Sequence, residues 1–137
     1  MPHTDHIADL HEVIYVSTLA PDVPPSVVAE IVGKARRHNP RMGITGLLIF
    51  DGMRFCEQIE GSQKDVLAQL ERIRQDTRHI NLRVVHQGPL AGRRFRRFSM
   101  GYTTLDDDDA LGRLEALTSQ EAIAAFQALL SSLDLDA

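Results

Sequence analysis

Residues 43–60 read GITGLLIFDGMRFCEQIE, two runs of strand-forming residues separated by a turn signal. The first run is almost continuously apolar, which is typical of a buried strand. Asp51-Gly52 is one of the dipeptides that most strongly favour a two-residue hairpin turn. We expect the returning strand to extend from Met53 to Glu60. The stretch therefore predicts a β-hairpin.

The returning strand contains one anomaly, a carboxylate on its apolar face. Successive side chains of a strand point to opposite faces, so Met53, Phe55, Glu57 and Ile59 share one face. Glu57 is expected to point inward, where a carboxylate is costly unless it is neutral, hydrogen-bonded or facing a ligand. The alternative is a glutamate at the rim of the sheet. We interpret Glu57 as a candidate site residue.

The remaining segments complete a β-α-β-β-α-β order, which is the ferredoxin-like arrangement. The first helix should stop at Asn39, because the residue before a proline is pushed out of helical geometry. Ser62 and Asp65 resemble a capping box at the start of the second helix. The predicted ranges are strands over 13–17, 43–50, 53–60, 82–86 and 98–102, helices over 26–39 and 62–76, and two short helices after 106–109. We therefore expect an α+β fold, a ferredoxin-like sheet with an appended fifth strand and two C-terminal helices.

Composition and charge exclude several classes of protein. The 137 residues suit one domain, and 43% hydrophobic with 25% charged residues is usual for a soluble globular chain. No apolar run approaches the ~18 residues of a membrane span, and residues 1–6 lack the pattern of a signal peptide. Cys56 alone cannot form an internal disulfide. A net charge of −4 argues against a protein that grips nucleic acid. We expect a cytoplasmic protein that binds neither membranes nor nucleic acid.

Other polar residues have ordinary interpretations when they are taken one at a time. Tyr15 can face inward, but a buried tyrosine is usually a core residue with a tethered hydroxyl. Arg72 and Asp76 are four residues apart, which alone predicts a weak surface ion pair. The run from Arg93 to Arg97 could touch RNA, although a short solvated turn fits it better. The six histidines show no metal-ligand spacing, so no metal site is expected.

Six segments, in this order, resemble the BLUF family of flavin-based blue-light sensors. They are IYVS (14–17), HNP (38–40), GITGLL (43–48), FCEQIEG (55–61), RIRQDTRH (72–79), and RRF with FSM (93–100). The resemblance covers residues 10–102. It implies a BLUF-like flavin-binding domain over 10–103 and a C-terminal helical extension over 104–137. The extension resembles that of short members, which have no fused enzyme and work by contacting other proteins.

The resemblance also implies a cofactor and a set of site residues. The cofactor would be a non-covalent flavin between the two helices, FAD in most members, with FMN or riboflavin as alternatives. An arginine suits its phosphates because the guanidinium fork can chelate them. By position, Tyr15 would pass an electron and a proton to the excited flavin. Ile31 would pack on the flavin ring, and Asn39 would hydrogen-bond the polar edge of that ring. Arg72 with Asp76 would border the ribityl and phosphate groups, and Met100 would relay the signal.

The chain departs from the family at its signature glutamine, whose light-driven amide rearrangement is the switch. Glu57 occupies that position, and Gln58 cannot replace it because a shift of one residue reverses the sheet face. A protonated glutamate offers one donor and one acceptor, so it could still bridge Tyr15 and the flavin, yet it has no amide to reorient. We hypothesise that flavin binds while the reversible red-shifted photoproduct is weak or missing. Phe98 stands where many members have tryptophan.

Two other functions stay open at this point. A BLUF-like scaffold without flavin could serve only as a protein-interaction module. An acylphosphatase-like hydrolase would need an arginine just after the first strand, and residues 18–22 contain none. We therefore expect a non-enzymatic sensor with an unknown downstream protein partner. A homo-oligomer is also expected, because one sheet face would be left partly uncovered and the tail helices look amphipathic.

Overall fold

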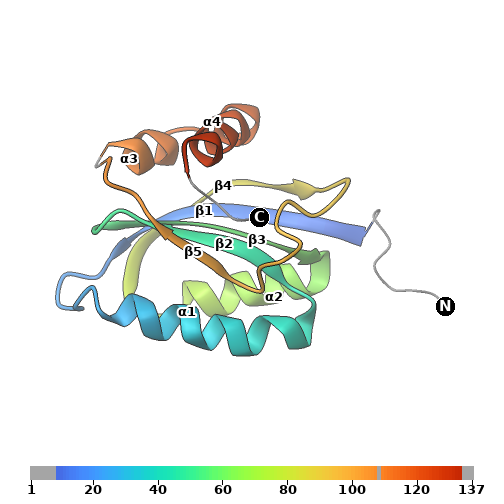
Figure 1. The fold of residues 1–137 in the computed structure, drawn as a ribbon, viewed down its shortest axis with the longest axis horizontal. Helices are drawn as coiled ribbons and strands as arrows, with labels where there is room; N and C mark the ends of the chain where they lie inside the picture. Colours follow the sequence, from blue (N-terminus) through green and yellow to red (C-terminus); the bar gives the residue numbers. More distant parts are fainter. Residues whose placement is uncertain (1–8, 108, 134–137) are drawn as a thin grey trace.

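The computed structural model describes residues 9–107 and 109–133 as one mixed five-stranded sheet with helices on both faces (Figure 1). The strand order is β4-β1-β3-β2-β5, with β5 parallel to β2 and all other neighbours antiparallel. The elements are β1 Leu10–Leu19, α1 Val27–His38, the 3₁₀ helix η2 Asn39–Met42, β2 Thr45–Phe50, β3 Arg54–Ser62, α2 Gln63–Arg74, β4 His79–Pro89, β5 Gly101–Thr104, α3 Ala110–Glu115 and α4 Ser119–Ser132. The predicted ferredoxin-like α+β fold with a fifth strand and two C-terminal helices is confirmed. Residues 1–8, 108 and 134–137, and with them part of the predicted extension, lie outside the described residues.

Two glycines explain how the chain enters β2. Gly43 closes η2 with a φ of +65°, in the left-handed region that favours glycine. Gly46 lies so close to β3 that a Cβ atom there would be 2.1 Å from the carbonyl oxygen of Gln58. The N–H of Gly46 donates to the carbonyl oxygen of Phe98 at 3.1 Å. The missing side chain therefore lets β3 and the loop before β5 approach β2 together.

The first helix does not end as the proline rule predicted. Asn39 keeps helical backbone angles, φ −60° and ψ −39°, and its N–H donates to the carbonyl oxygen of Ala35. The α-helix ends where expected, but the expected reason was wrong, because Pro40 lies in the first turn of η2, where the missing N–H of proline costs no hydrogen bond. The chain thus turns directly from α1 into η2.

Three further boundaries, besides those of β1 and β4, which are longer than expected, differ from the sequence prediction. Met53 belongs to the hairpin turn and is 59% exposed, because the Asp51 carboxylate accepts the N–H groups of Met53 and Arg54. The second helix ends at Arg74, since the Asp76 carboxylate turns to accept from residue 78. The fifth strand begins at Gly101 and not at 98. In the first two cases a local side-chain hydrogen bond competes with the regular structure.

Side-chain alternation sorts the sheet into two apolar cores. The core under α1 and α2 includes Val13, Tyr15, Val32, Leu48, Ile59 and Leu70. The core under α3 and α4 includes Ile14, Val16, Leu47, Ile49, Leu111, Leu114 and Phe126. The last three are at most 2% exposed, so the expected partly uncovered sheet face is wrong. Self-association stays a prediction, but an uncovered sheet face no longer supports it.

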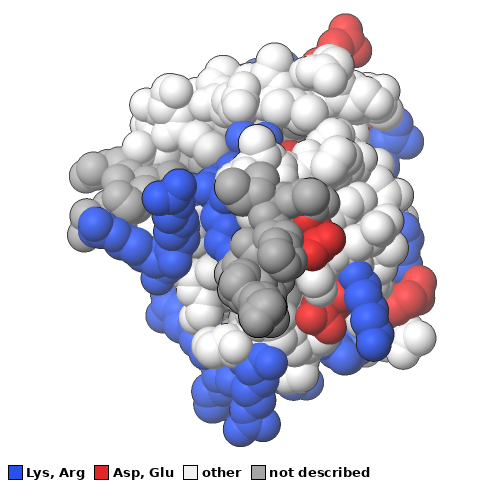
Figure 2. Space-filling model, turned by 90° about the vertical axis from the view of Figure 1, so that its right-hand side faces the viewer, with Lys and Arg blue, Asp and Glu red and all other residues white. Residues whose placement is uncertain are grey.

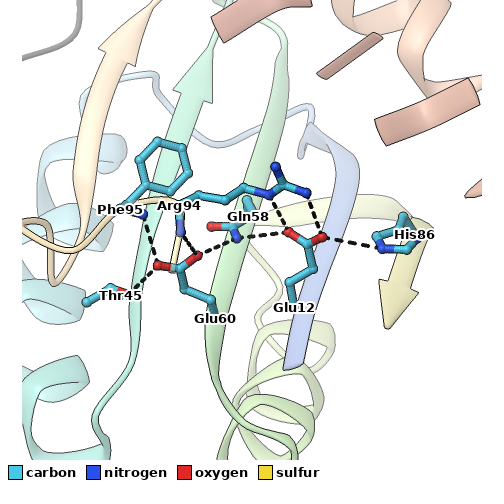
Figure 3. Close-up of polar contacts among 7 residues, drawn as sticks. All are labelled: Glu12, Thr45, Gln58, Glu60, His86, Arg94 and Phe95. Atoms are coloured by element: carbon cyan, nitrogen blue, oxygen red, sulfur yellow. Dashed lines mark hydrogen bonds and ion pairs between the residues drawn. The ribbon is translucent and has the colours of Figure 1, made fainter. Parts of the chain in front are cut away.

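A buried cluster of polar side chains fastens the loop before β5 to the face covered by α3 and α4 (Figure 3). Glu60 is fully buried and its carboxylate accepts four hydrogen bonds. The donors are Thr45 Oγ1 at 2.6 Å, Gln58 Nε2 at 2.9 Å, and the backbone N–H groups of Arg94 at 2.9 Å and Phe95 at 3.0 Å. One carboxylate therefore joins β2, β3 and the loop.

Glu12 completes this cluster from β1. The Arg94 guanidinium donates to it through Nε at 2.8 Å and Nη2 at 2.9 Å, Gln58 Nε2 donates at 3.1 Å, and His86 Nε2 lies 3.4 Å away. Burial raises the pKa of Glu12, but the hydrogen bonds from Arg94 and Gln58 and the charge of Arg94 outweigh it and leave the pKa below its ordinary value. The expected solvated turn is wrong for this part of the basic run, because Arg94 and Phe95 are drawn inward.

Replacing Gly46 with alanine should destabilise the fold, because the new Cβ would meet the backbone of β3. We expect the free energy of unfolding to fall by at least about 1–3 kcal/mol. Gly92→Ala is the matched control, since a Cβ at Gly92 has no heavy atom within 4 Å, and it should change the value by less than about 0.5 kcal/mol. Urea unfolding of the two variants measures the difference, and equal stabilities would contradict the close approach.

Candidate functional site

A cavity of about 300 Å³ lies between α1, α2 and the sheet. This volume is at the lower end of the range for small-molecule sites. Its apolar lining consists of Ile31, Ala35, Leu48, Phe55 and Ile73. Its polar lining comes from α1, α2, β1, β3 and the turn that leads into β4. The cavity therefore combines an apolar interior with charged groups, of which Lys34 and Arg72 are exposed.

Tyr15 and Glu57 form a hydrogen-bonded pair in the cavity wall. They face each other across the β1–β3 ladder, are 4% and 7% exposed, and the Tyr15 hydroxyl donates to Glu57 Oε1. Burial raises the pKa of Glu57 to about 7, although the hydrogen bond from Tyr15 lowers it. Burial, the charge of Glu57 and their hydrogen bond raise the pKa of Tyr15 well above its ordinary value. The inward orientation predicted for Glu57 is confirmed, and the rim alternative is wrong.

Gln58 lies on the opposite face of β3, as the alternation predicted. The β1–β3 and β2–β3 registers run without a shift through this position. Its amide nitrogen is committed to Glu12 and Glu60 on the far side of the sheet. No bulge turns it toward Tyr15, so it cannot take the place of the family's glutamine.

His79 is a lining residue that its sequence context did not reveal. It caps the end of α2, because its Nε2 lies 2.6 Å from the carbonyl oxygen of Ile73. A carbonyl can only accept, so Nε2 carries the proton, and Nδ1 accepts from Ser17 Oγ at 2.8 Å. The ring meets Tyr15 edge-on, with centroids 6.2 Å apart. His79 therefore holds one side of the wall around Tyr15.

Arg72 and Asp76 both line the cavity but do not pair with each other. Arg72 donates to Gln69 Oε1 at 2.6 Å and contacts the sulfur of Met42 at 2.9 Å. Asp76 instead binds the Arg78 guanidinium at 2.6–3.2 Å, and these hydrogen bonds hold its pKa below its usual value despite partial burial. The expected surface ion pair between Arg72 and Asp76 is wrong, because α2 ends before Asp76.

The other predicted site residues fall into two groups. Ile31 lines the cavity, whereas Asn39 and Met100 do not. Asn39 is fully buried and donates through Nδ2 to the carbonyl oxygen of Ser99 at 2.7 Å, and Arg36 Nε donates to that of Met100 at 3.0 Å. Met100 is buried in the same core as Tyr15. The structure therefore places Asn39 and Met100 together at the segment that enters β5, beside the cavity.

The groups present fit a flavin. The apolar lining suits a flat aromatic ring, and two buried atoms, Asn39 Oδ1 and His38 Nε2, have no protein partner among the described residues. Lys34, Arg72 and Arg78 supply cations that suit phosphate groups. Lys34 and Arg78 were missed in the sequence, because their pairing with this cavity depends on how distant elements pack.

The described residues contain neither a cluster of metal-ligand side chains nor a helix that could span a membrane. No group of three or more His, Cys, Asp or Glu side chains that could hold a metal ion occurs in the described part of the chain. Within residues 9–107 and 109–133, no helix has the length and hydropathy needed to cross a bilayer.

Comparison with known proteins identifies the family. Residues 10–101 match the family described as "BLUF: Sensors of blue-light using FAD". The Escherichia coli (strain K12) "Blue light- and temperature-regulated antirepressor BluF" is 36% identical over 73 residues, which are 53% of this chain and 18% of that protein. The chain therefore spans less than a fifth of that relative.

Solved structures agree with this match. The structure described as "BlrB - a BLUF protein, dark state structure" has a TM-score of 0.76 and 28% identity, and the alignment covers 93% of this chain and all of that one. "Klebsiella pneumoniae BlrP1 with FMN and cyclic diGMP, no metal ions" has a TM-score of 0.71 and 29% identity, over 89% of this chain and 34% of that one. Because the family match spans well over half of its residues, the chain belongs to the BLUF family.

Proposed function

We propose that this chain is a blue-light receptor domain that binds a flavin in the cavity between α1 and α2 and signals through contacts with other proteins. The observation that carries the proposal is the buried hydrogen bond from Tyr15 to Glu57 in the cavity wall. FAD is the flavin named in the family description, and the FMN in the BlrP1 structure makes FMN the main alternative. The antirepressor activity in the name of BluF supports an output through protein contacts and not through catalysis. A cytoplasmic location remains part of the proposal.

Tyr15 and Glu57 are the proposed photoactive residues. A bound flavin, when excited by blue light, supplies an electron acceptor. The Tyr15 hydroxyl is already directed at Glu57 Oε1, so an ionised Glu57 is positioned to take the phenol proton. A pKa of about 7 makes both protonation states of Glu57 accessible near neutral pH. Unlike an amide, the carboxyl group has no NH₂ that could exchange places with its oxygen.

The remaining proposed site residues hold the flavin or flank it. Ile31 would pack on the ring, and Arg72 would bind phosphate, because its guanidinium is exposed at the cavity. We assign Asp76 an indirect role, since its carboxylate orients Arg78. Asn39 has a free buried acceptor, Oδ1, beside the cavity residue His38. Met100 would move when the packing around Tyr15 changes, because both side chains belong to the same core.

Glu57→Gln should restore a reversible red shift of the flavin absorption band after blue illumination, because it returns a reorientable amide to the wall beside Tyr15. We expect the wild-type band to stay in place or bleach. The matched control is Glu71→Gln, which makes the same chemical change on an exposed side chain of α2. Absorption spectra in the dark and after illumination test this.

Two results would contradict that account of Glu57. One is a wild-type protein that already gives a full, reversible shift. The other is a Glu57→Gln protein that binds flavin and stays photochemically silent. A protein that takes up no flavin at all would instead defeat the proposed receptor function.

The stability of the flavin-free protein should depend on pH through Glu57. Its pKa is raised from 4.5 to about 7 in the folded state, so the folded protein binds this proton more tightly than the unfolded chain. The contribution of Glu57 to the free energy of unfolding is therefore greatest below pH 4.5 and is lost as the pH rises toward 7. We expect the difference in free energy of unfolding between wild type and Glu57→Gln to fall across this window by up to about 3 kcal/mol. Urea unfolding at several pH values measures it, and a pH-independent difference would show that Glu57 is not desolvated.

A further inference from the structure

Exposed arginines gather at the end of the molecule where η2 meets the loop between β4 and β5. Figure 2 views this end and shows Lys and Arg side chains along its left and lower edges and also on its right, where they alternate with Asp and Glu side chains. We call Arg37, Arg41, Arg96 and Arg97 the arginine surface, and all four are exposed. None of the four guanidinium groups has a hydrogen bond or an ion pair with another of the described residues. In a chain of net charge −4, such a concentration of unpaired positive charge calls for an explanation.

The buried polar cluster under the loop explains why these side chains point outward. Glu60 binds the backbone N–H groups of Arg94 and Phe95, and Glu12 binds the Arg94 guanidinium through two of its nitrogens (Figure 3). The positive charge of Arg94 is thereby balanced by the Glu12 carboxylate, and Phe95 is only 3% exposed. With these two residues held inward, Arg96 and Arg97 are left to solvent on a fixed backbone. A surface held in its binding conformation loses less entropy when a partner binds.

Three hydrogen bonds place Arg37 and Arg41 beside this loop. The carbonyl oxygen of Phe98 accepts from the N–H of Gly46, that of Ser99 from Asn39 Nδ2, and that of Met100 from Arg36 Nε. These bonds join the end of the loop to β2, η2 and the last turn of α1. Arg37 follows Arg36 on that turn, and Arg41 lies in η2. The four arginines therefore belong to one end of the molecule although 60 residues separate the two segments.

We propose that the arginine surface binds an acidic segment of a partner protein. This inference rests on the proposed signalling through protein contacts and names the chemistry of the partner. Guanidinium groups bind carboxylates through paired hydrogen bonds, which gives geometric selectivity as well as attraction. A single-stranded nucleic acid fits less well, because such sites also offer exposed aromatic side chains on which bases stack, and Phe95, the aromatic residue of this basic run, is only 3% exposed.

The test compares two doubly substituted proteins of equal charge. Arg96→Ala with Arg97→Ala removes half of the arginine surface, while Arg74→Ala with Arg83→Ala removes two exposed arginines from α2 and β4. The probe is a fluorescent oligoglutamate peptide, and its binding to the full chain is measured by anisotropy in the dark at low and physiological salt. We expect the first protein to bind about three- to tenfold more weakly than wild type, because each exposed ion pair contributes little. The control should stay within about twofold, and circular dichroism checks that both fold.

Three outcomes would overturn the proposal. Equal weakening in both proteins would mean that only net charge matters. Tighter binding of a single-stranded oligonucleotide of matched charge would make the surface a nucleic-acid site. Absence of peptide binding at low salt would leave the surface without the proposed ligand class. Because binding is measured in the dark, a failure of the light response would defeat the proposed function and leave this test unaffected.

Discussion

The alternation of side chains along β3 is the constraint on which both polar sites depend. β3 is paired with β1 from Arg54 to Ser62 and with β2 from Phe55 to Glu60, without a register shift in either ladder. Glu57 consequently enters the cavity, and Gln58 and Glu60 enter the cluster on the other face. A slip of one residue would exchange these environments and would turn the apolar side chains of the strand away from their cores. The chain therefore has an adjacent glutamine that geometry prevents from replacing Glu57.

The pKa values of the buried carboxyl groups on the two faces of the sheet are shifted in opposite directions, because the two faces offer them different numbers of hydrogen-bond donors. Glu57 has one hydrogen-bond donor among the described residues, the Tyr15 hydroxyl, and burial raises its pKa to about 7. Glu12 has the Arg94 fork and the Gln58 amide, and its pKa lies below the ordinary value although it is only 1% exposed. Burial alone thus does not decide whether a carboxyl group is ionised, because hydrogen bonds and a nearby positive charge can outweigh it. The cavity holds the carboxylate that can change charge near neutral pH, and the cluster holds one that stays ionised and anchors a loop.

Patterns along the chain were enough to predict the order of the elements and the opposite faces of Glu57 and Gln58, because a strand's alternation is a local property. They were not enough to predict the orientation of Arg94, whose partner Glu12 lies 82 residues away. The same limit hid the pairing of Asp76 with Arg78, since a short-range carboxylate turn replaced the expected last turn of helix. The cavity could be anticipated only through the family resemblance. Its walls come from α1, α2, the strands β1 to β4 and the turn before β4, and no single segment of the sequence determines how these elements pack.

The segment that enters β5 connects the cavity with the arginine surface. The Met100 side chain lies in the core that contains Tyr15, while its carbonyl oxygen is bound by Arg36, the neighbour of Arg37. Cores are close-packed, so a rearrangement around Tyr15 that displaced Met100 would have to break or move that hydrogen bond. The cluster at Glu60 holds the preceding loop, so the displacement would be confined to the last turn of α1 and to β5. A chemical event in the cavity that displaced Met100 would therefore move Arg37 relative to Arg96 and Arg97, and the proposed acidic partner would bind the changed surface differently.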